Sequence, residues 1–271
     1  MLKVITKKDI ELLINFYKNI NDLDDDHIRQ IYDDLEYSKL MFASINKDKI
    51  DYLLSVNIIN NNYHMEKLLF KEYDESLTKD LISFAITELR KDDRGLNVIY
   101  DNFPYDEVMN EIMLEQGFKC NYLNMSWSYD GLHQELIKPS ISLNDKKDDV
   151  TIYIYRRLIE DIKSNDIYLG TNSLIPDIST IRLENTNVAV TRDEAGNVTG
   201  TLRFGIVSNS ILLDSMYADN ELIYKDLINL VRNLTNKDIE ISITPSRVNI
   251  IKLLESFGFK KIQTDYIFKL N

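Results

Sequence analysis

The same pattern occurs twice in this chain, and the repeat limits the possible folds more than any other feature. Glu111–Lys119 and Ile251–Lys260 both have the pattern of an amphipathic helix that stops at a glycine followed at once by an aromatic residue. A glycine just past the last helical residue is a common helix stop. The two glycines, Gly117 and Gly258, lie 141 residues apart (258 − 117). About half of the chain therefore repeats, which predicts two copies of one domain.

The likeness extends upstream and downstream of these helices. The segment Thr78–Phe84 matches Tyr224–Leu230, with an offset of 146 residues between their aspartates (226 − 80). A strand pattern follows each glycine, at Cys120–Tyr129 and at Ile262–Leu270. Because the offsets nearly agree, the repeat covers a whole domain and not one helix.

The composition is typical of a soluble globular protein. Hydrophobic residues make up 44% of the 271 residues and charged residues 28%. The net charge of −12 argues against a nucleic-acid partner, because duplex binding depends on lysine and arginine, and against an anionic membrane surface. No apolar run approaches the roughly 18 residues of a membrane helix. Met1–Asp9 becomes charged too early for a signal peptide, so we expect a cytoplasmic protein.

Metal and disulfide chemistry have little support in the sequence. The three histidines, His27, His64 and His133, lie far apart and no pair has the spacing of metal ligands. Cys120 is the only cysteine, which excludes an internal disulfide and a thiolate cluster. We therefore expect no metal site, and we expect Cys120 to be a small buried hydrophobic residue.

The element order follows from hydrophobic periodicity and from turn residues. The first copy is predicted to contain strands at Leu2–Thr6, Lys39–Ile45, Ile50–Ile59, Tyr63–Phe70 and Leu96–Tyr100, and helices at about Asp9–Asn19 and Glu75–Lys91 and after Pro104. The second copy is predicted to contain strands at Val150–Tyr155, Asn187–Thr191, Asn197–Val207, Ser210–Met216 and Ile239–Thr244, and helices at Glu221–Asn233 and Ser246–Ser256.

This order predicts an α/β protein of the α+β type. Each copy has three meandering strands and then a helix, a strand, a helix and a strand, which gives a mixed, mostly antiparallel sheet with helices on both faces. Residues 131–149 lack periodicity and contain Pro139, so they are interpreted as a linker. The predicted domains are 1–130 and 150–271. Gly200 and Gly205, inside a predicted strand, mark a bulge or a close approach of backbone.

The order of elements and the closing segment Leu253–Ile262 resemble the GNAT superfamily of acyl-CoA-dependent N-acyltransferases. The resemblance spans nearly the whole chain as a tandem pair and is strongest at Asn187–Leu230 and Asn249–Leu270. It implies a bulged fourth strand that splays from the fifth, with acetyl-CoA as co-substrate in the resulting cleft. It also implies that the pyrophosphate binds backbone amides at the start of the following helix, where the helix dipole favours an anion.

The phosphate loop departs from the pattern of that family. The two small positions of the loop correspond to Ser76 and Thr78 in the first copy, and to Leu222 and Tyr224 in the second. Small residues let the backbone approach the phosphates, so the first copy is favoured as the CoA site. Acidic neighbours such as Asp74 oppose a polyanion. The resemblance implies these cofactor-binding residues: Leu68, Leu69, Phe70, Ser76, Leu77, Thr78, Lys79, Met216 and Tyr217.

Acyl transfer to an amine needs a base, an oxyanion donor and an acid for the leaving thiolate. The family usually supplies the acid from a tyrosine in the helix before the glycine, and this chain has Met113 and Leu254 there. Glu66 and Asp214 lie on the fourth strands and are the candidate bases. A carboxylate among apolar neighbours has a raised pKa and can accept a proton. The alternative for each is an exposed or ion-paired carboxylate on the other face of the sheet.

Two hypotheses follow for the function. The first is an N-acetyltransferase that acts on a small amine or a peptide amine, with one working cleft, favoured in the first copy, and one structural domain. The second is a catalytically inactive tandem protein that binds a ligand or acts as a scaffold. The negative charge favours a cationic substrate by electrostatic steering. The sequence leaves open whether the protein is a monomer or a homodimer.

Overall fold

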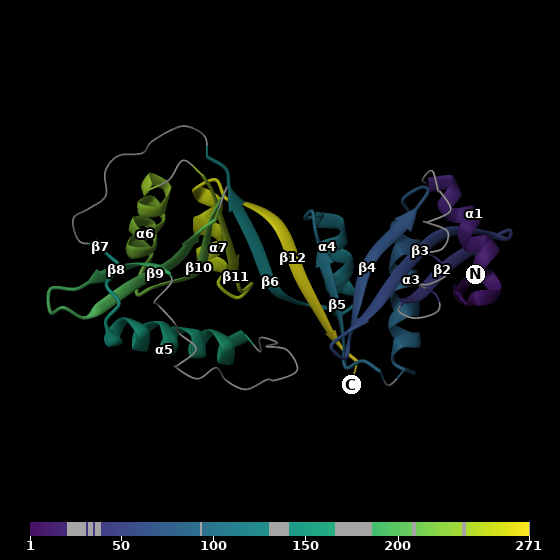
Figure 1. Cartoon of the computed structure of the whole chain (residues 1–271), viewed down its shortest axis with the longest axis horizontal. Helices are drawn as coiled ribbons and strands as arrows, with labels where there is room; N and C mark the ends of the chain where they lie inside the picture. The colour runs from purple at the N-terminus through teal and green to yellow at the C-terminus, as the bar shows by residue number, and fades with distance from the viewer. Residues whose placement is uncertain are drawn as a thin grey trace. The chain divides into compact units, whose positions relative to one another are not determined.

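The computed structural model of the protein describes residues 1–20, 31, 35, 39–92, 94–129, 141–165, 186–207, 210–234 and 237–270 (Figure 1). These residues contain six α-helices, one short 3-10 helix and twelve strands. None of the helices in this part of the chain is long and apolar enough to cross a membrane. The chain divides into two compact units: unit 1 is Met1–Asn102, Asp106–Cys120 and Asp265–Asn271, and unit 2 is Phe103–Tyr105 and Asn121–Thr264.

Unit 1 contains the amino-terminal copy of the repeat. Its elements are β1 (Leu2–Val4), a 3-10 helix (Lys7–Asp9), α1 (Ile10–Ile20), β2 (Lys39–Asn46), β3 (Lys49–Ile59), β4 (Asn62–Phe70), α3 (Glu75–Leu89), β5 (Asn97–Asn102) and α4 (Glu107–Glu115). The strand order is β1-β2-β3-β4-β5-β12. β1 to β4 are antiparallel neighbours, and β4 and β5 are parallel.

Unit 2 has the same succession of elements. They are β7 (Ile141–Leu143), α5 (Asp148–Asn165), β8 (Asn187–Arg192), β9 (Val198–Ile206), β10 (Ser210–Ala218), α6 (Glu221–Leu234), β11 (Asp238–Ile243) and α7 (Val248–Ser256). The strand order is β12-β6-β11-β10-β9-β8-β7. β7 to β10 are antiparallel neighbours, β10 and β11 are parallel, and β6 is antiparallel to β11.

Two strands are shared between the units along the chain. β6 (Lys119–Trp127) starts in unit 1 and continues in unit 2, whereas β12 (Lys260–Lys269) starts in unit 2 and ends in unit 1. Trp127 therefore lies in the core of unit 2, although it belongs to the first copy of the repeat. The predicted division at residues 130 and 150 differs from the compact units by this exchange of closing strands.

The strands of each unit carry helices on both faces, as the sequence predicts. In unit 2, Leu227 of α6 and Leu254 of α7 pack in one core on one face, and α5 packs on the other through Val150 and Ile154 (Figure 1). In unit 1, α3 and α4 share a core on one face, and α1 contacts the opposite face through Leu13. The predicted fold class is confirmed: the protein is of the α+β type, and each unit has mixed, mostly antiparallel strands with helices on both faces.

The predicted strand at Val150–Tyr155 is wrong, because these residues lie in α5. The local sequence alternates between isoleucine and tyrosine, which suits a strand. The buried residues, however, are Val150 and Ile154, with Leu158 packed partly against the same cluster, and this spacing of four is helical. Asp148 and Asp149 in the first turn also favour the helix through its dipole.

Part of the predicted linker belongs to the second copy. Ile141–Leu143 forms β7, which pairs antiparallel with β8 as β1 pairs with β2. The remaining linker residues before them, 131–140, lie outside the described residues. The repeat thus begins earlier in the second copy than the sequence pattern indicates.

Candidate functional site

The fourth strand of unit 1 contains a β-bulge at Glu66. Lys67 of β4 pairs with Ser55 of β3, and the next pair along is Met65 with Val56. Glu66 is therefore an extra residue with no partner in the register. A bulge bends its strand and increases the local twist.

The bulge lies where β4 leaves β5. The parallel pairing of these strands runs from Asn62 with Asn97 to Met65 with Tyr100 and ends there. β4 nevertheless continues to Phe70. The strands of unit 1 thus part directly after Met65, and the backbone of β4 beyond the bulge does not pair with β5.

Unit 2 repeats this construction at the corresponding position. Leu213 of β10 pairs with Phe204, and the next pair along is Ser215 with Arg203, so Asp214 is the bulged residue. The parallel pairing of β10 with β11 ends at Leu213 with Ile241. Both candidate bases, Glu66 and Asp214, are therefore the bulged residues of their strands.

Neither candidate base has apolar surroundings. The Glu66 side chain is exposed and accepts a hydrogen bond from the Asn57 amide of β3. Asp214 is 53% exposed and forms an ion pair with Arg203, at 2.7 Å between Nη2 and Oδ2. Their roles as bases stay predictions. Both residues lie at a bulge, but neither has the apolar neighbours that would raise the pKa of a carboxylate.

The gap of unit 1 begins beside a tyrosine that sequence reasoning did not select. Tyr100 belongs to the last pair before the strands part, and its ring stacks on Tyr266 with a centroid distance of 6.4 Å. Burial, with added repulsion from Asp106 and Asp101, raises the pKa of Tyr100 to about 12. Within the part of the chain that the structure describes, its hydroxyl has no hydrogen-bond partner. Tyr100 is therefore a protonated donor beside the gap.

The amino end of α3 is occupied by groups of unit 1 itself. Asp74 caps the helix, because its Oδ1 accepts a hydrogen bond from the Leu77 amide at 3.0 Å. The Thr78 hydroxyl is fully buried and donates to the Asp74 carbonyl at 2.9 Å. The Tyr52 hydroxyl donates to the Glu72 carbonyl at 2.7 Å and accepts from the Asp74 amide. Ser76 is exposed in the first turn.

A cavity of about 450 Å³ lies at this end of α3. Its lining includes Tyr52, Lys71, Glu72, Tyr73, Asp74 and Leu77. Lys79 is paired with two carboxylates, Glu75 at 2.8 Å and Glu115 at 2.6 Å, and these hydrogen bonds raise its pKa. The Thr78 hydroxyl and the Lys79 ammonium, both candidates for phosphate contacts, thus already have partners in the protein.

The gap of unit 2 contains an arginine. Arg247 precedes α7, and its Nη2 donates to the Met216 carbonyl of β10 at 2.7 Å and to the Tyr224 hydroxyl of α6 at 2.6 Å. The guanidinium also lies 5.1 Å from the ring centroid of Tyr217. Its Nη1 approaches Asp161 of α5 at 3.8 Å.

These contacts come from both faces of the sheet. Tyr224 packs with α6 and α7 on one face, whereas Tyr217 packs with α5 on the other. Burial raises the pKa of Asp161, and Arg247 and a hydrogen bond to Tyr217 oppose this rise. Arg247 therefore lies between the parted strands and closes the position where the resemblance places the acyl group.

Both units have a GNAT-like fold. No model of a known protein family matches the sequence, and no curated protein matches it. The order of elements, the bulge in the fourth strand and its parting from the fifth are in each unit those that the resemblance implies.

Solved structures similar to the chain include several acetyltransferases. A GCN5-related N-acetyltransferase from Sphaerobacter thermophilus has a TM-score of 0.49 and 11% identity, with 100% of this chain and 96% of that chain covered. A GNAT-family acetyltransferase from Colwellia psychrerythraea has a TM-score of 0.44 and 11% identity, with both chains fully covered. A tandem GNAT protein of the clavulanic acid biosynthesis pathway has a TM-score of 0.39 and 10% identity over 100% and 99% of the two chains. The GNAT-like assignment depends on the topology of each unit.

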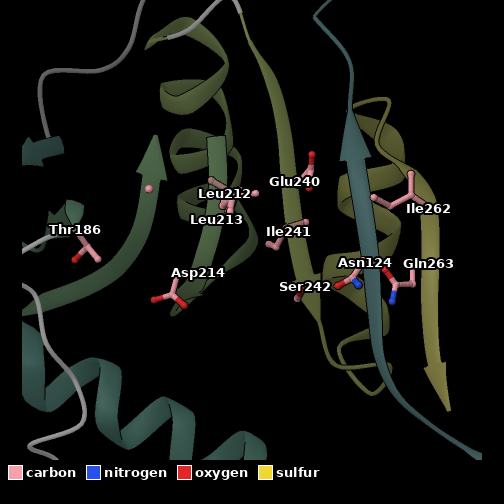
Figure 2. A pocket seen from close by; sticks show the side chains of 11 residues that line it. Asn124, Thr186, Leu212, Leu213, Asp214, Glu240, Ile241, Ser242, Ile262 and Gln263 are labelled. Carbon is pink, nitrogen blue, oxygen red and sulfur yellow. Dashed lines mark hydrogen bonds between the residues drawn. The ribbon is translucent and has the colours of Figure 1, made fainter. Parts of the chain in front are cut away.

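Unit 2 of this GNAT-like pair also contains a pocket of about 470 Å³ (Figure 2). Asp214 lines it together with Leu212, Glu240, Ser242, Asn124 and Gln263. Leu212, Glu240 and Ser242 alternate with the core residues Ile211, Leu213, Ile239, Ile241 and Ile243, so they point to the face opposite α6 and α7. The pocket therefore lies on the face of the sheet that carries α5.

The remaining predicted cofactor residues are divided between core and surface. Leu68 and Leu69 are partly buried, Phe70 is 38% exposed, and Leu77 is partly buried. Met216 and Tyr217 are buried in unit 2, and the Met216 carbonyl is bound by Arg247. In unit 1, Leu68 and Tyr100 therefore pack against the same core, whereas Leu69 packs on the opposite face. In unit 2, Arg247 contacts the Met216 carbonyl and the Tyr224 hydroxyl at the corresponding position.

Sequence reasoning missed Tyr100 and Arg247, although the repeat contained a signal for both. The offset of 141 residues aligns Tyr100 with Ile241 (241 − 100) and Asp106 with Arg247 (247 − 106). At the first position only one copy has a proton donor, and at the second the two copies carry charges of opposite sign. The gaps of the two copies therefore differ. Aligning the copies position by position would have selected both residues.

Proposed function

We propose that the protein is an acyl-CoA-dependent N-acetyltransferase that acts on a small amine or a peptide amine in unit 1, with unit 2 as its structural domain. The observation that carries the proposal is the difference between the two gaps. In unit 1 the strands part beside an unpartnered phenol, Tyr100. In unit 2 Arg247, which follows β11, donates hydrogen bonds to β10 and to α6 beside the parted strands.

The residues of unit 1 suit acyl transfer from acetyl-CoA as a co-substrate, which would supply the activated thioester. Backbone groups of Leu68–Phe70 lie beyond the bulge, and amides there can donate to the oxygen on which negative charge develops. Glu66, at the bulge, is the group that takes the proton of the acceptor ammonium. The Tyr100 hydroxyl is the group that gives its proton to the departing thiolate.

The surface charge of the protein favours a cationic acceptor. The net charge is −12, and acidic groups including Glu66 and Asp101 lie near the gap of unit 1. A negative field raises the local concentration of a cationic substrate and its rate of association. A primary amine that is protonated in solution is therefore the acceptor class that the electrostatics support best.

A second candidate function has support from the amino end of α3. Asp74 caps this helix, and Glu72 and Glu75 add negative charge beside the position where CoA phosphates would lie. Carboxylates there compete with a phosphate for the same backbone amides. This observation favours the alternative, a catalytically inactive protein that binds a ligand other than CoA.

A thermal unfolding experiment separates the two candidates. Acetyl-CoA and desulfo-CoA are added to the full chain, and a ligand at ~100 times its dissociation constant adds ~2.7 kcal/mol of stability. We expect both to raise the unfolding temperature, and we expect release of free CoA thiol from acetyl-CoA when amines are added. Absence of any shift at millimolar concentration would contradict the enzyme and favour the second candidate.

A further inference from the structure

The pocket of unit 2 plays no part in the proposed acyl transfer, which is assigned to unit 1. It is bounded by residues of β6, β10, β11 and β12, as Figure 2 shows, and has a volume of about 470 Å³. A volume of this size is typical of pockets for small molecules.

The two glycines of β9 differ in the space around them, and only Gly205 lines the pocket. A Cβ on Gly200 would lie 2.5 Å from Cγ2 of Ile223 and 2.7 Å from Oγ1 of Thr191, so close packing requires this glycine. A Cβ on Gly205 would meet nothing within 4 Å. Gly205 pairs with Leu212 and lines the pocket.

The fold itself therefore gives no packing reason for glycine at position 205. Glycine in a strand interior weakens the strand, and it often marks a place where a ligand approaches the backbone. Because position 205 has no side chain, the space beside it is part of the pocket. This is an indication of a ligand that is independent of the charges in the pocket.

The charge in the pocket comes from Glu240. Its side chain is partly buried between Leu212 of β10 and Ser126 of β6, its neighbours across the sheet. Among the described residues, Glu240 has no hydrogen bond and no ion pair. Asp214, by contrast, is paired with Arg203. A partly buried carboxylate without a counterion favours a cation beside it.

The remaining walls fit an organic cation better than a metal ion. Leu212 and Ile262 give apolar contact area, and Asn124, Ser242 and Gln263 give neutral polar groups. Ser242 already donates to the Asn124 side-chain oxygen, which fixes the orientation of the amide. In the described part of the chain no group of three metal-ligating side chains occurs.

We propose that this pocket of unit 2 is a recognition site for a small organic amine, bound as its ammonium ion by Glu240. The Gly205 side of the pocket accommodates the body of the ligand, and the amide and hydroxyl groups of β6, β11 and β12 contact its polar substituents. Because Arg247 closes the acyl site of the same unit, the amine bound here is recognised and not acetylated. The inference goes beyond the proposed function and does not depend on it.

Calorimetric titration of the full chain tests this site without acetyl-CoA. The probes are glucosamine and tyramine, and each is compared with its uncharged N-acetyl counterpart. We expect at least one of the two amines to bind at millimolar concentration or below, and its N-acetyl counterpart to bind at least about tenfold more weakly, as loss of a charged hydrogen bond predicts. Failure of both amines to bind would overturn the proposal.

Three variants locate the binding. Glu240→Gln should weaken the amine on the order of tenfold. Glu194→Gln, which removes the same charge at an exposed turn of the same unit, should not change it. Gly205→Leu should block the pocket, because the leucine side chain enters the open space beside position 205. A cooperative thermal unfolding transition should show that this variant folds.

The control in the other unit is Glu66→Gln. If this variant abolishes amine binding while Glu240→Gln and Gly205→Leu leave it unchanged, the amine binds in unit 1 and the proposal is overturned. Because acetyl-CoA is absent from these titrations, a failure of the acetyltransferase proposal leaves their outcome unaffected. The two proposals can therefore fail separately.

Discussion

At the scale of single residues, Tyr100 and Arg247 distinguish the gaps of the two copies. Both lie next to parted strands, yet one presents a phenol without a partner and the other fills the gap with hydrogen bonds. Neither residue interrupts a hydrophobic pattern or forms a known motif. Their roles depend on neighbours that are distant in sequence, so local patterns do not reveal them.

Replacement of Tyr100 by phenylalanine tests the proton donor. The variant keeps the ring that stacks on Tyr266 and removes only the hydroxyl. We expect kcat for acetyl transfer to fall by about 10²-fold, the lower range for loss of a general acid. The dissociation constant of acetyl-CoA should not change. Tyr105→Phe serves as the control, and an equal loss in both variants would contradict the assignment.

Replacement of Arg247 by alanine tests the closed gap of unit 2. The change leaves the Met216 carbonyl and the Tyr224 hydroxyl without their donor. Each buried polar group that loses its partner costs about 1–3 kcal/mol. Because two groups lose their donor, we expect the free energy of unfolding, measured in urea, to decrease by about 2–6 kcal/mol. Lys225→Ala, at an exposed ion pair of α6, should stay within about 0.5 kcal/mol of the parent.

The amino end of α3 is the element in which stability and ligand binding conflict. Asp74 stabilises the helix as its cap, and its charge opposes a phosphate at the same amides. Serine caps a helix about as well as aspartate and carries no charge. The two effects of Asp74 can therefore be separated by one substitution.

Asp74→Ser should tighten acetyl-CoA binding several-fold while the unfolding temperature changes little, because the cap is kept and the repulsion is removed. Titration calorimetry measures the first quantity and thermal unfolding the second. Asp80→Ser, on the exposed face of the same helix, is the matched control. Equal dissociation constants in parent and Asp74→Ser would mean that the phosphates bind elsewhere.

Strand β9 offers a matched pair of substitutions. Gly200→Ala places a methyl group against Ile223 and Thr191, so we expect a loss of about 1–3 kcal/mol of stability from overpacking. Gly205→Ala meets nothing within 4 Å and should be neutral or slightly stabilising. Urea denaturation of both variants gives the comparison. Equal effects would contradict the open pocket beside Gly205.

Most elements could be predicted from periodicity; besides the short strand β7 in the predicted linker, the exception is α5, and it has a physical reason. The helices α3, α4, α6 and α7 and the strands around them follow the predicted order. α5 was predicted as a strand because β-branched and aromatic residues alternate at Val150–Tyr155. These residues form a helix because Val150 and Ile154, four residues apart, both pack on β8. Tertiary contacts of this kind outweigh local propensity.

The candidate site could be predicted in part. The positions of Glu66 and Asp214 at corresponding points of two strands followed from the repeat, and both are bulged residues. Their exposure could not be predicted, because it depends on which partners, Asn57 and Arg203, lie on the neighbouring strands. A one-residue bulge changes the face to which a strand residue points, and sequence alternation does not encode it.

At the scale of the whole molecule, the repeat predicts two copies, but not which closing strand belongs to which unit. β6 continues into unit 2, and β12 ends in unit 1. The strand pattern after each glycine is nearly the same in both copies, so the sequence does not distinguish a strand that pairs within its own copy from one that is exchanged. Each unit consequently needs residues of both copies for its core.

The central claim is that one acetyl-CoA binds per chain, in unit 1. Calorimetric titration of acetyl-CoA into the parent, Ser76→Trp and Leu222→Trp tests it most directly, because both positions are exposed and correspond in the two copies. The account predicts one site in the parent, no binding to Ser76→Trp and unchanged binding to Leu222→Trp. Two sites in the parent, no binding to the parent, or loss of binding only in Leu222→Trp would contradict it.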